Sequence, residues 1–159
     1  MNKRRAFVVG TNVSKSLSPT IFNYWFKKYH IDAEYEYKEI KEESFDKEIK
    51  LILKEDGLLG LNITTPFKEK IITHLDVLEK HSTQIGAVNC VSRTDKTLEG
   101  TNTDWTGFED SLLWAQKHIT PKIKEKNIAV VIGYGGSAKA IIYSLFFMGF
   151  KIIKVFNRS

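Results

Sequence analysis

The chain has 159 residues, of which 42% are hydrophobic and 27% are charged, and its formal net charge is +5. This balance excludes a disordered or fibrous chain, and the single cysteine excludes an intramolecular disulfide. Lysine and arginine alternate with acidic residues, as in residues 38–43 and 122–126. A nucleic-acid surface gathers basic residues on one face, so we expect no nucleic-acid partner.

The first predicted element is a strand at residues 6–10, which leads into a polar loop at 11–18. The Ser-Pro step at Ser18 predicts a helix start, with the serine as cap and the proline in the first turn. A strand at 35–40 and an amphipathic helix at 44–55 follow it. The aromatic residues of the first helix recur at helical spacing and predict one buried face, made of Phe22, Trp25, Phe26 and Tyr29.

A short strand at residues 60–64 is predicted to run into a second helix, capped by Thr65 and continuing to residue 75. Residues 87–92 and 98–101 predict two strands joined by a turn. A third helix begins at residue 103 or 104, and the Thr-Pro step at residues 120 and 121 ends it.

The last part of the chain alternates strand, glycine loop, helix and strand over residues 128–156. A continuous apolar strand, such as 128–132, is typical of a parallel sheet. The alternation predicts an α/β protein: an open domain with a mainly parallel sheet at residues 1–103, then a connector helix and the first βαβ half of a Rossmann domain at 104–159.

The longest apolar stretch, residues 141–150, contains a serine and a glycine and is too short to cross a bilayer. The basic N-terminus lacks the apolar core of a signal peptide. We therefore expect a cytoplasmic protein with no membrane partner, and the sequence carries no signal for an oligomeric state.

The glycine loop has the spacing of a dinucleotide-binding turn. Gly133, Gly135 and Ala138 occupy the G-x-G-x-x-G/A positions, which need a tight turn, close approach of a pyrophosphate and close helix packing. The helix that starts near Gly136 directs unpaired N–H groups at that pyrophosphate. The alternative is a structural glycine turn in an α/β fold.

Asn157, Arg158 and Ser159 follow the second strand, where an NAD enzyme usually carries Asp or Glu. A guanidinium favours the 2′-phosphate of NADP, which a carboxylate would repel. The alternative is an arginine on the surface.

Three further polar positions have the chemistry of a ligand site. Ser16 and Ser18 lie two residues apart, so both hydroxyls are able to bind one carboxylate; the alternative is plain helix capping. Lys68 lies in the first turn of a predicted helix, where the dipole disfavours a cation and favours proton exchange; the alternative is a solvated lysine beside Glu69. Asp104 is either a helix cap or the partner of Lys68 in proton transfer.

Six short motifs run in order along the whole chain: Ser16-Leu17-Ser18-Pro19, Asn62-Ile63-Thr64-Thr65-Pro66-Phe67-Lys68, Gly86-Ala87-Val88-Asn89, Asn102-Thr103-Asp104, Gly133-Tyr134-Gly135-Gly136 and Asn157-Arg158-Ser159. Together, in order and spacing, they resemble the shikimate dehydrogenase family. The resemblance implies reversible, NADPH-dependent reduction of 3-dehydroshikimate to shikimate in aromatic amino-acid (chorismate) biosynthesis.

The resemblance also implies the roles of individual residues, and it implies no metal. The catalytic residues would be Lys68 and Asp104. The substrate would bind in a cleft between the domains, its carboxylate to Ser16 and Ser18 and the rest of it to Asn62, Thr64, Asn89 and Asp104. NADP would bind to Gly133, Tyr134, Gly135, Gly136, Ser137, Asn157, Arg158 and Ser159.

The chain departs from the family pattern at a few positions, of which Tyr134 matters most because its bulk would crowd the pyrophosphate. Family members also continue beyond Ser159 with the rest of the cofactor domain and a terminal helix. We therefore expect a truncated chain that is marginally folded and inactive alone. Two alternatives stay open: a non-catalytic, ligand-binding remnant, and an NAD-using relative that accepts quinate or shikimate.

Overall fold

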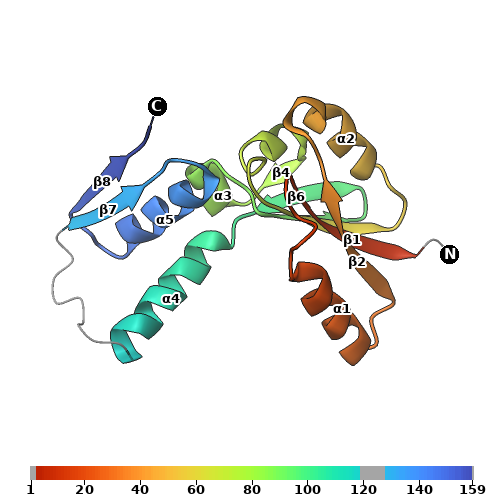
Figure 1. The fold of residues 1–159 in the computed structure, drawn as a ribbon, viewed down its shortest axis with the longest axis horizontal. Coiled ribbons are helices and arrows are strands. Elements are labelled where there is room, and N and C mark those ends of the chain that lie inside the picture. The colour runs from red at the N-terminus through yellow and green to blue at the C-terminus, as the bar shows by residue number, and fades with distance from the viewer. Residues whose placement is uncertain (1–2, 119–127, 159) are drawn as a thin grey trace.

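The computed structural model describes residues 3–118 and 128–158, in two sheets joined by a long helix (Figure 1). The elements of the first sheet and its helices are β1 (Arg4–Gly10), α1 (Ser18–Lys28), β2 (Ala33–Glu39), the 3-10 helix η1 (Glu42–Ser44), α2 (Phe45–Ile52), β3 (Leu58–Ile63), the 3-10 helix η2 (Lys70–His74), β4 (Val77–Leu78), α3 (Lys80–Ile85), β5 (Cys90–Thr94) and β6 (Thr97–Thr101). The remaining elements are α4 (Asp104–His118), β7 (Ile128–Ile132), α5 (Gly136–Phe147) and β8 (Ile152–Phe156).

The first sheet has the strand order β2-β1-β3-β5-β6-β4. Strand β1 pairs in parallel with both β2 and β3, and β4 pairs in parallel with β6. Strand β5 is antiparallel to both of its neighbours, β3 and β6. The mainly parallel α/β architecture expected from the sequence is confirmed, with one antiparallel hairpin, β5–β6, inserted into it.

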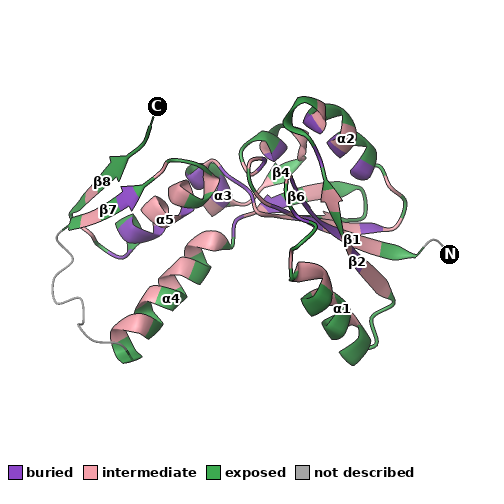
Figure 2. Ribbon diagram, viewed as in Figure 1, coloured by how far each residue is buried: buried purple, intermediate pink, exposed green. Residues whose placement is uncertain are grey.

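Strand β1 shows how the sequence builds the core, because its successive side chains point to opposite faces of the sheet. Phe7 and Val9 are fully buried on the face covered by α2, in a cluster that contains Phe45 and Ile49. Val8 lies on the other face, beneath α1. The largest buried cluster therefore lies between the sheet and α2, as the burial colours of Figure 2 show.

Helix α1 departs from the expectation of one buried aromatic face. Phe22 and Phe26 pack on the Tyr35 cluster, but Trp25 is 44% exposed and Tyr29 is 62% exposed. The reason is that α1 lies alone on its face of the sheet, so only the side turned toward the strands is covered. Helical spacing predicted the helix correctly and overstated how much of it is buried.

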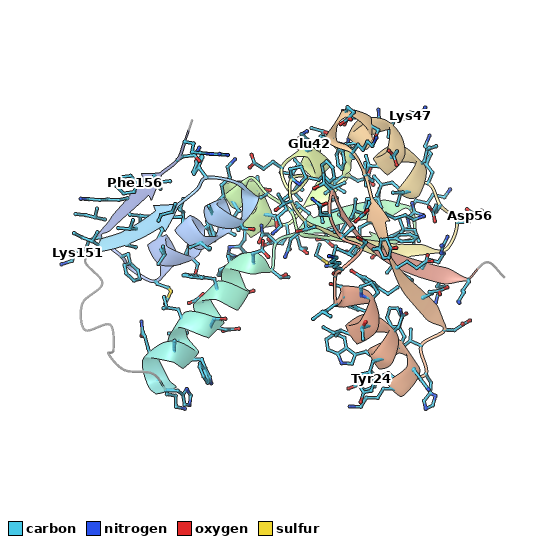
Figure 3. The ribbon with its side chains drawn as sticks, in the orientation of Figure 1. Tyr24, Glu42, Lys47, Asp56, Lys151 and Phe156 are labelled. Atoms are coloured by element: carbon cyan, nitrogen blue, oxygen red, sulfur yellow. The ribbon has the colours of Figure 1, made fainter. Side chains whose placement is uncertain are left out.

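The second sheet contains β7 and β8, which pair in parallel and pack against α5. The predicted strand, helix and strand are confirmed here, while the predicted helix end at Thr120-Pro121 lies outside the described residues. On β7, Ile128 is 54% exposed, Val130 is 58% exposed and Ile132 is 88% exposed. Figure 3 shows Phe156 of β8, and Lys151 just before this strand, at the opposite end of the molecule from Asp56.

Helix α4 connects the two sheets and packs against α5. At its first turn, the Trp105 ring contacts His81 of α3 and Tyr143 of α5, with centroid separations of 4.8 and 5.6 Å. The Tyr143 hydroxyl donates to Gln84 at 2.7 Å and lies 2.6 Å from Nδ1 of His81. This aromatic cluster fixes α3, α4 and α5 to one another. No helix among the described residues is long and apolar enough to span a membrane.

We predict that amide hydrogen exchange of the 159-residue chain is slow in β1, β3 and β5 and fast in β7 and β8. The central strands are paired on both sides, whereas among the described residues β7 and β8 each have one unpaired edge and several exposed apolar side chains. Exchange measured by mass spectrometry on peptides from each strand tests this. Equal protection of the two sheets would contradict it.

Candidate functional site

The loop after β1 carries two serine hydroxyls at the start of α1. The N–H groups of Val13 and Ser14 donate to Oε1 of Glu39 at 3.0 and 2.9 Å, which fixes the loop to the end of β2. The Ser14 hydroxyl, and then these N–H groups, hold the pKa of the Glu39 carboxyl below its usual range. A charged group at the end of β2 therefore ties down the segment that precedes Ser16 and Ser18.

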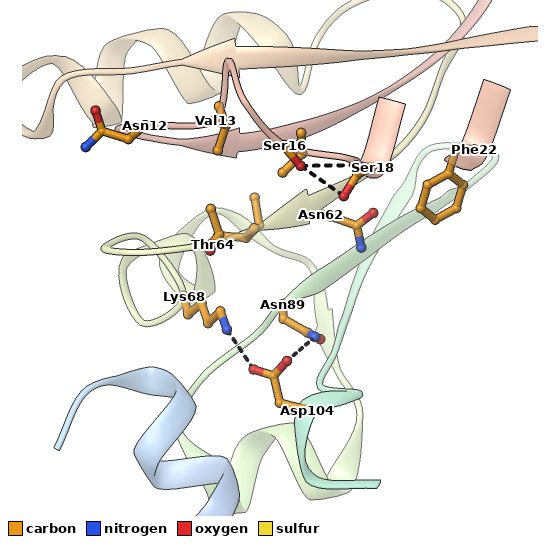
Figure 4. Close-up of a pocket in the computed structure, with 12 residues that line it drawn as sticks. Asn12, Val13, Ser16, Ser18, Phe22, Asn62, Thr64, Lys68, Asn89 and Asp104 are labelled. Atoms are coloured by element: carbon orange, nitrogen blue, oxygen red, sulfur yellow. Dashed lines mark hydrogen bonds and ion pairs between the residues drawn. The ribbon is translucent and has the colours of Figure 1, made fainter. Parts of the chain in front are cut away.

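Ser18 is not the helix cap that the sequence predicts. Leu17 occupies the cap position and Ser18 is the first helical residue. Its N–H donates to Oγ of Ser16 at 3.2 Å, and the two hydroxyl oxygens lie 3.1 Å apart. Because Ser16, and not Ser18, accepts a backbone N–H at the start of the helix, the two hydroxyls lie side by side there (Figure 4).

Strands β2 and β3 contribute a hydrogen-bonded pair next to the serines, the buried Tyr35 and the half-buried Asn62. The Tyr35 hydroxyl donates to Oδ1 of Asn62 at 2.6 Å. Burial raises the pKa of this hydroxyl, so it stays a donor to the amide oxygen. The Asn62 amide nitrogen has no partner within residues 3–118 and 128–158, and Asn62 lines the cavity. Asn23 holds the Tyr35 backbone in turn, with bonds of 2.8 and 2.9 Å to its carbonyl and its N–H.

Lys68 lies in a turn, not in the helix expected from Thr65 to residue 75. The Thr65-Pro66 peptide is cis, residues 65–69 form turns, and only the short 3-10 helix η2 follows. In an α-helix the Lys68 carbonyl would accept from residue 72, but here it accepts from the N–H of Val88 at 2.7 Å. Lys68 therefore does not lie in the first turn of an α-helix, and the dipole of the predicted helix does not act on its positive charge.

The Lys68 ammonium nonetheless meets a carboxylate. Its Nζ lies 2.7 Å from Oδ2 of Asp104, and the two side chains are 12% and 27% exposed. The other carboxylate oxygen accepts from Nδ2 of Asn89 at 2.8 Å. Asp104 thus holds a cation on one oxygen and an amide on the other, as Figure 4 shows.

Two residues before α4 set the position of Asp104. Asn102 is buried, donates to the carbonyl of Ala87 at 2.9 Å, and accepts from the Asp104 N–H at 2.9 Å. The Thr103 N–H donates to Oδ1 of Asn89 at 2.9 Å. The carboxylate also lies in the first turn of α4, where the helix dipole favours a negative charge.

These side chains line one cavity of about 430 Å³ between the first sheet and the start of α4. Every residue predicted to bind substrate or to transfer a proton lies on its wall, with two hydroxyls at one end and the Lys68–Asp104 pair at the other (Figure 4). The full lining consists of Val8, Asn12, Val13, Ser16, Ser18, Phe22, Asn62, Ile63, Thr64, Lys68, Asn89 and Asp104.

The arrangement suits a small ligand that carries several hydroxyls and an anionic group. Hydroxyls, amides and an ammonium offer donors along the wall, while the Asp104 carboxylate offers an acceptor. Sequence reasoning did not assign Tyr35, Asn102 or Thr103 to this site. A polar residue directly before a helix was the available signal for the last two, whereas the role of Tyr35 depends on which strands are neighbours.

The glycine loop lies at the start of α5, where Gly133 has φ +102° and donates its N–H to the Phe156 carbonyl at 2.7 Å. A Cβ added to Gly133 or Gly135 would meet open space. The cap residue Gly135 has no side chain that could accept from the helix, so among the described residues the first N–H groups of α5 remain available to an anion.

A cavity of about 620 Å³ joins this loop to the end of β8, lined by Gly133, Tyr134, Gly135, Phe156, Asn157 and Arg158 along with Ile132. The structure thus places Gly133, Tyr134 and Gly135 on one cavity with Asn157 and Arg158. Gly136 and Ser137 instead line a neighbouring cavity of about 350 Å³, and Ser159 lies outside the described residues. Tyr134 is 53% exposed and its ring lies under the Lys139 ammonium, 5.4 Å from the centroid. Within the described residues, no group of three His, Cys, Asp or Glu side chains is placed to hold a metal.

Two solved structures illustrate the fold similarity. The shikimate 5-dehydrogenase of Thermus thermophilus, in complex with NADP(H) and shikimate, has a TM-score of 0.78 and 29% identity over 98% of this chain and 56% of that one. The shikimate 5-dehydrogenase of Listeria monocytogenes, in complex with shikimate and NAD, has a TM-score of 0.79 and 30% identity over 99% of this chain and 52% of that one.

The sequence comparisons agree. The shikimate dehydrogenase of Thermotoga petrophila is 40% identical over 152 residues, which cover 96% of this chain and 54% of that protein. This chain therefore spans about half the length of the relatives that it matches. The family model described as the shikimate dehydrogenase substrate binding domain matches residues 8–91. The chain belongs to the shikimate dehydrogenase family.

Proposed function

We propose that the protein containing this chain is a shikimate dehydrogenase, which reversibly reduces 3-dehydroshikimate to shikimate with NADPH in aromatic amino-acid biosynthesis. Residues 1–103 are the substrate-binding catalytic domain, and residues 104–159 are the connector helix and the first part of the NADP-binding domain. The observation that carries the proposal is the cavity that joins a pair of serine hydroxyls to the Lys68–Asp104 pair.

The substrate has one carboxylate and several ring oxygens, and the cavity offers matching groups. Ser16 and Ser18 present two adjacent hydroxyls to the carboxylate. Asn62, Thr64 and Asn89 lie along the wall and bind the ring hydroxyls. Asp104 accepts from the hydroxyl at the reacting carbon, since it lies beside Lys68.

Lys68 supplies the proton. NADPH, when bound, supplies the hydride that goes to the carbonyl carbon. As that carbon is reduced, its oxygen gains negative charge, which the Lys68 ammonium stabilises and then neutralises by donating a proton. Asp104 holds the ammonium in place before the transfer. In the reverse direction the neutral lysine takes the proton from the hydroxyl.

The residues around the glycine loop fit a dinucleotide. Open space above Gly133 and Gly135 lets a pyrophosphate approach the free N–H groups of α5. Arg158 lies at the far end of the same cavity, with no acidic residue in its lining, and suits the 2′-phosphate of NADP. Lys68 lines both the substrate cavity and a second cavity of about 350 Å³ beside the loop, which connects the two sites.

A second candidate function is binding of the ligand without turnover by the 159-residue chain itself. The observation that favours it is that the whole lining of the substrate cavity lies between Val8 and Asp104. The cofactor half, in contrast, presents a two-stranded sheet with an uncovered apolar face.

We predict that the 159-residue chain binds shikimate but does not oxidise it. Isothermal titration should show one site, and replacing both Ser16 and Ser18 by alanine should weaken binding by roughly tenfold or more, because hydrogen bonds to a charged carboxylate are lost. Thr20→Ala, an exposed hydroxyl near the same helix start, serves as the control. Absence of binding by a folded chain would refute this second candidate.

In a full-length protein that contains this chain, Lys68→Ala should lower turnover by roughly a hundredfold or more, with a smaller effect on substrate affinity, because general acid–base catalysis is lost. Asp104→Asn should impair both turnover and affinity, since the carboxylate holds the ammonium and a substrate hydroxyl. Lys70→Ala, an exposed neighbour paired with Glu42, should leave both unchanged. Turnover within threefold of the parent in Lys68→Ala would show that Lys68 does not transfer the proton.

The same full-length protein should prefer NADP to NAD. Arg158→Ala should weaken NADP binding by ~1.5–3 kcal/mol, the value of a charge-assisted hydrogen bond, and leave NAD binding nearly unchanged. Lys154→Ala, on the strand β8 that precedes Arg158, is the matched control, because Lys154 does not line the cavity. Equal use of the two cofactors by the parent would instead support the NAD-using relative.

A further inference from the structure

The catalytic lysine has a second contact, which reaches across to the other half of the molecule. Nζ of Lys68 donates to Oγ of Ser137 at 2.9 Å, in addition to its 2.7 Å bond to Asp104. Ser137 lies in the first turn of α5, directly after the glycine loop. One ammonium is thus shared between the substrate cavity and the cofactor loop.

The start of α5 is packed closely on the Lys68 turn. A Cβ added to Gly136 would lie 2.8 Å from Cβ of Lys68 and 3.3 Å from Cβ of Ala87, so a glycine is what allows this approach. Further along α5, Lys139 forms an ion pair with Glu69 at 2.5 Å. The end of α5 that holds Ser137 faces the junction in Figure 1. The contact between Lys68 and Ser137 is therefore part of a packed interface between α5 and the Lys68 turn.

The Ser137 hydroxyl is able to donate one further hydrogen bond. A serine hydroxyl accepts and also donates one proton. Within residues 3–118 and 128–158, Ser137 accepts from Lys68, and its own O–H finds no acceptor. Ser137 also lines the cavity of about 350 Å³ beside the glycine loop, in which the available N–H groups of α5 lie.

We propose that Ser137 is a positioning residue that links Lys68 to the cofactor. Its oxygen accepts a hydrogen bond from the Lys68 ammonium, and its O–H donates a hydrogen bond to a cofactor phosphate. This inference rests on the proposed function. A bound phosphate orients the hydroxyl so that its lone pairs face Lys68, and the ammonium is then held between Ser137 and Asp104. Cofactor binding therefore improves the placement of the group that protonates the substrate.

The link has a thermodynamic consequence. If cofactor binding improves the placement of Lys68, then NADP raises the affinity for shikimate, and shikimate raises the affinity for NADP by the same factor. Removing the hydroxyl removes this coupling. A role of Ser137 in packing alone would change the stability of the protein and leave the coupling in place.

The test uses a full-length protein that contains this chain and two variants of the hydroxyl, Ser137→Ala and Ser137→Thr. Turnover should fall by roughly tenfold in Ser137→Ala, the scale of one charge-assisted hydrogen bond, with a smaller change in KM for shikimate. Ser137→Thr should restore most of the turnover. Lys139→Ala is the matched control, because it breaks a different contact between α5 and the Lys68 turn, the ion pair with Glu69, and does not remove a partner of the ammonium.

The second readout is binding. Shikimate is titrated calorimetrically into each protein with and without saturating NADP, and the ratio of the two affinities should exceed one in the parent, in Ser137→Thr and in Lys139→Ala. In Ser137→Ala the ratio should fall to one. An unchanged ratio and unchanged turnover in Ser137→Ala would overturn the inference while leaving the proposed function intact. A parent protein with no shikimate turnover would overturn the proposed function and the inference with it.

Discussion

The ion pair between Lys68 and Asp104 is the interaction on which the rest of the molecule depends. Its two members come from segments far apart in the chain, a turn after β3 and the first residue of α4. A charge pair that is mostly buried is stable only when its remaining polar atoms are satisfied. Asn89 satisfies the second carboxylate oxygen, Asn102 fixes the backbone beneath it, and the hairpin β5–β6 holds both amides in place.

The sheet order explains why the other site residues converge on this pair. Strands β1, β2 and β3 are parallel neighbours, so the segments beyond their carboxyl ends meet at one edge, which is where ligands bind in open α/β sheets. The loop after β1 brings the serine hydroxyls there, and the turn after β3 brings the lysine. The antiparallel β5 begins at this edge, directly after Asn89, and runs away from it. Strand β6 then returns the chain to the same edge, where Asp104 follows it.

Local pattern predicted α2 and every strand of the described residues except the two-residue β4, because alternation and helical spacing report directly on which face is buried. It failed where distant contacts decide. Residues 65–75 have a proline start and helical spacing, yet they form no α-helix, because the Lys68 carbonyl accepts from the N–H of Val88. Ser18 has the composition of a cap, yet Ser16 takes that bond. The role of Tyr35 could not be predicted, because it depends on β2 lying next to β1 and on a hydrogen bond that reaches β3.

The position of the cavity lining along the chain has a consequence for synthesis. All of the lining lies between Val8 and Asp104, and the strands of the first sheet are complete by Thr101. Domains generally fold from the N-terminus as the ribosome releases them. The ligand cavity is therefore able to form while the glycine loop and α5 are still being translated. A ligand that binds the folded form and not the unfolded one stabilises it by mass action, so any ligand of this cavity would stabilise the nascent first half.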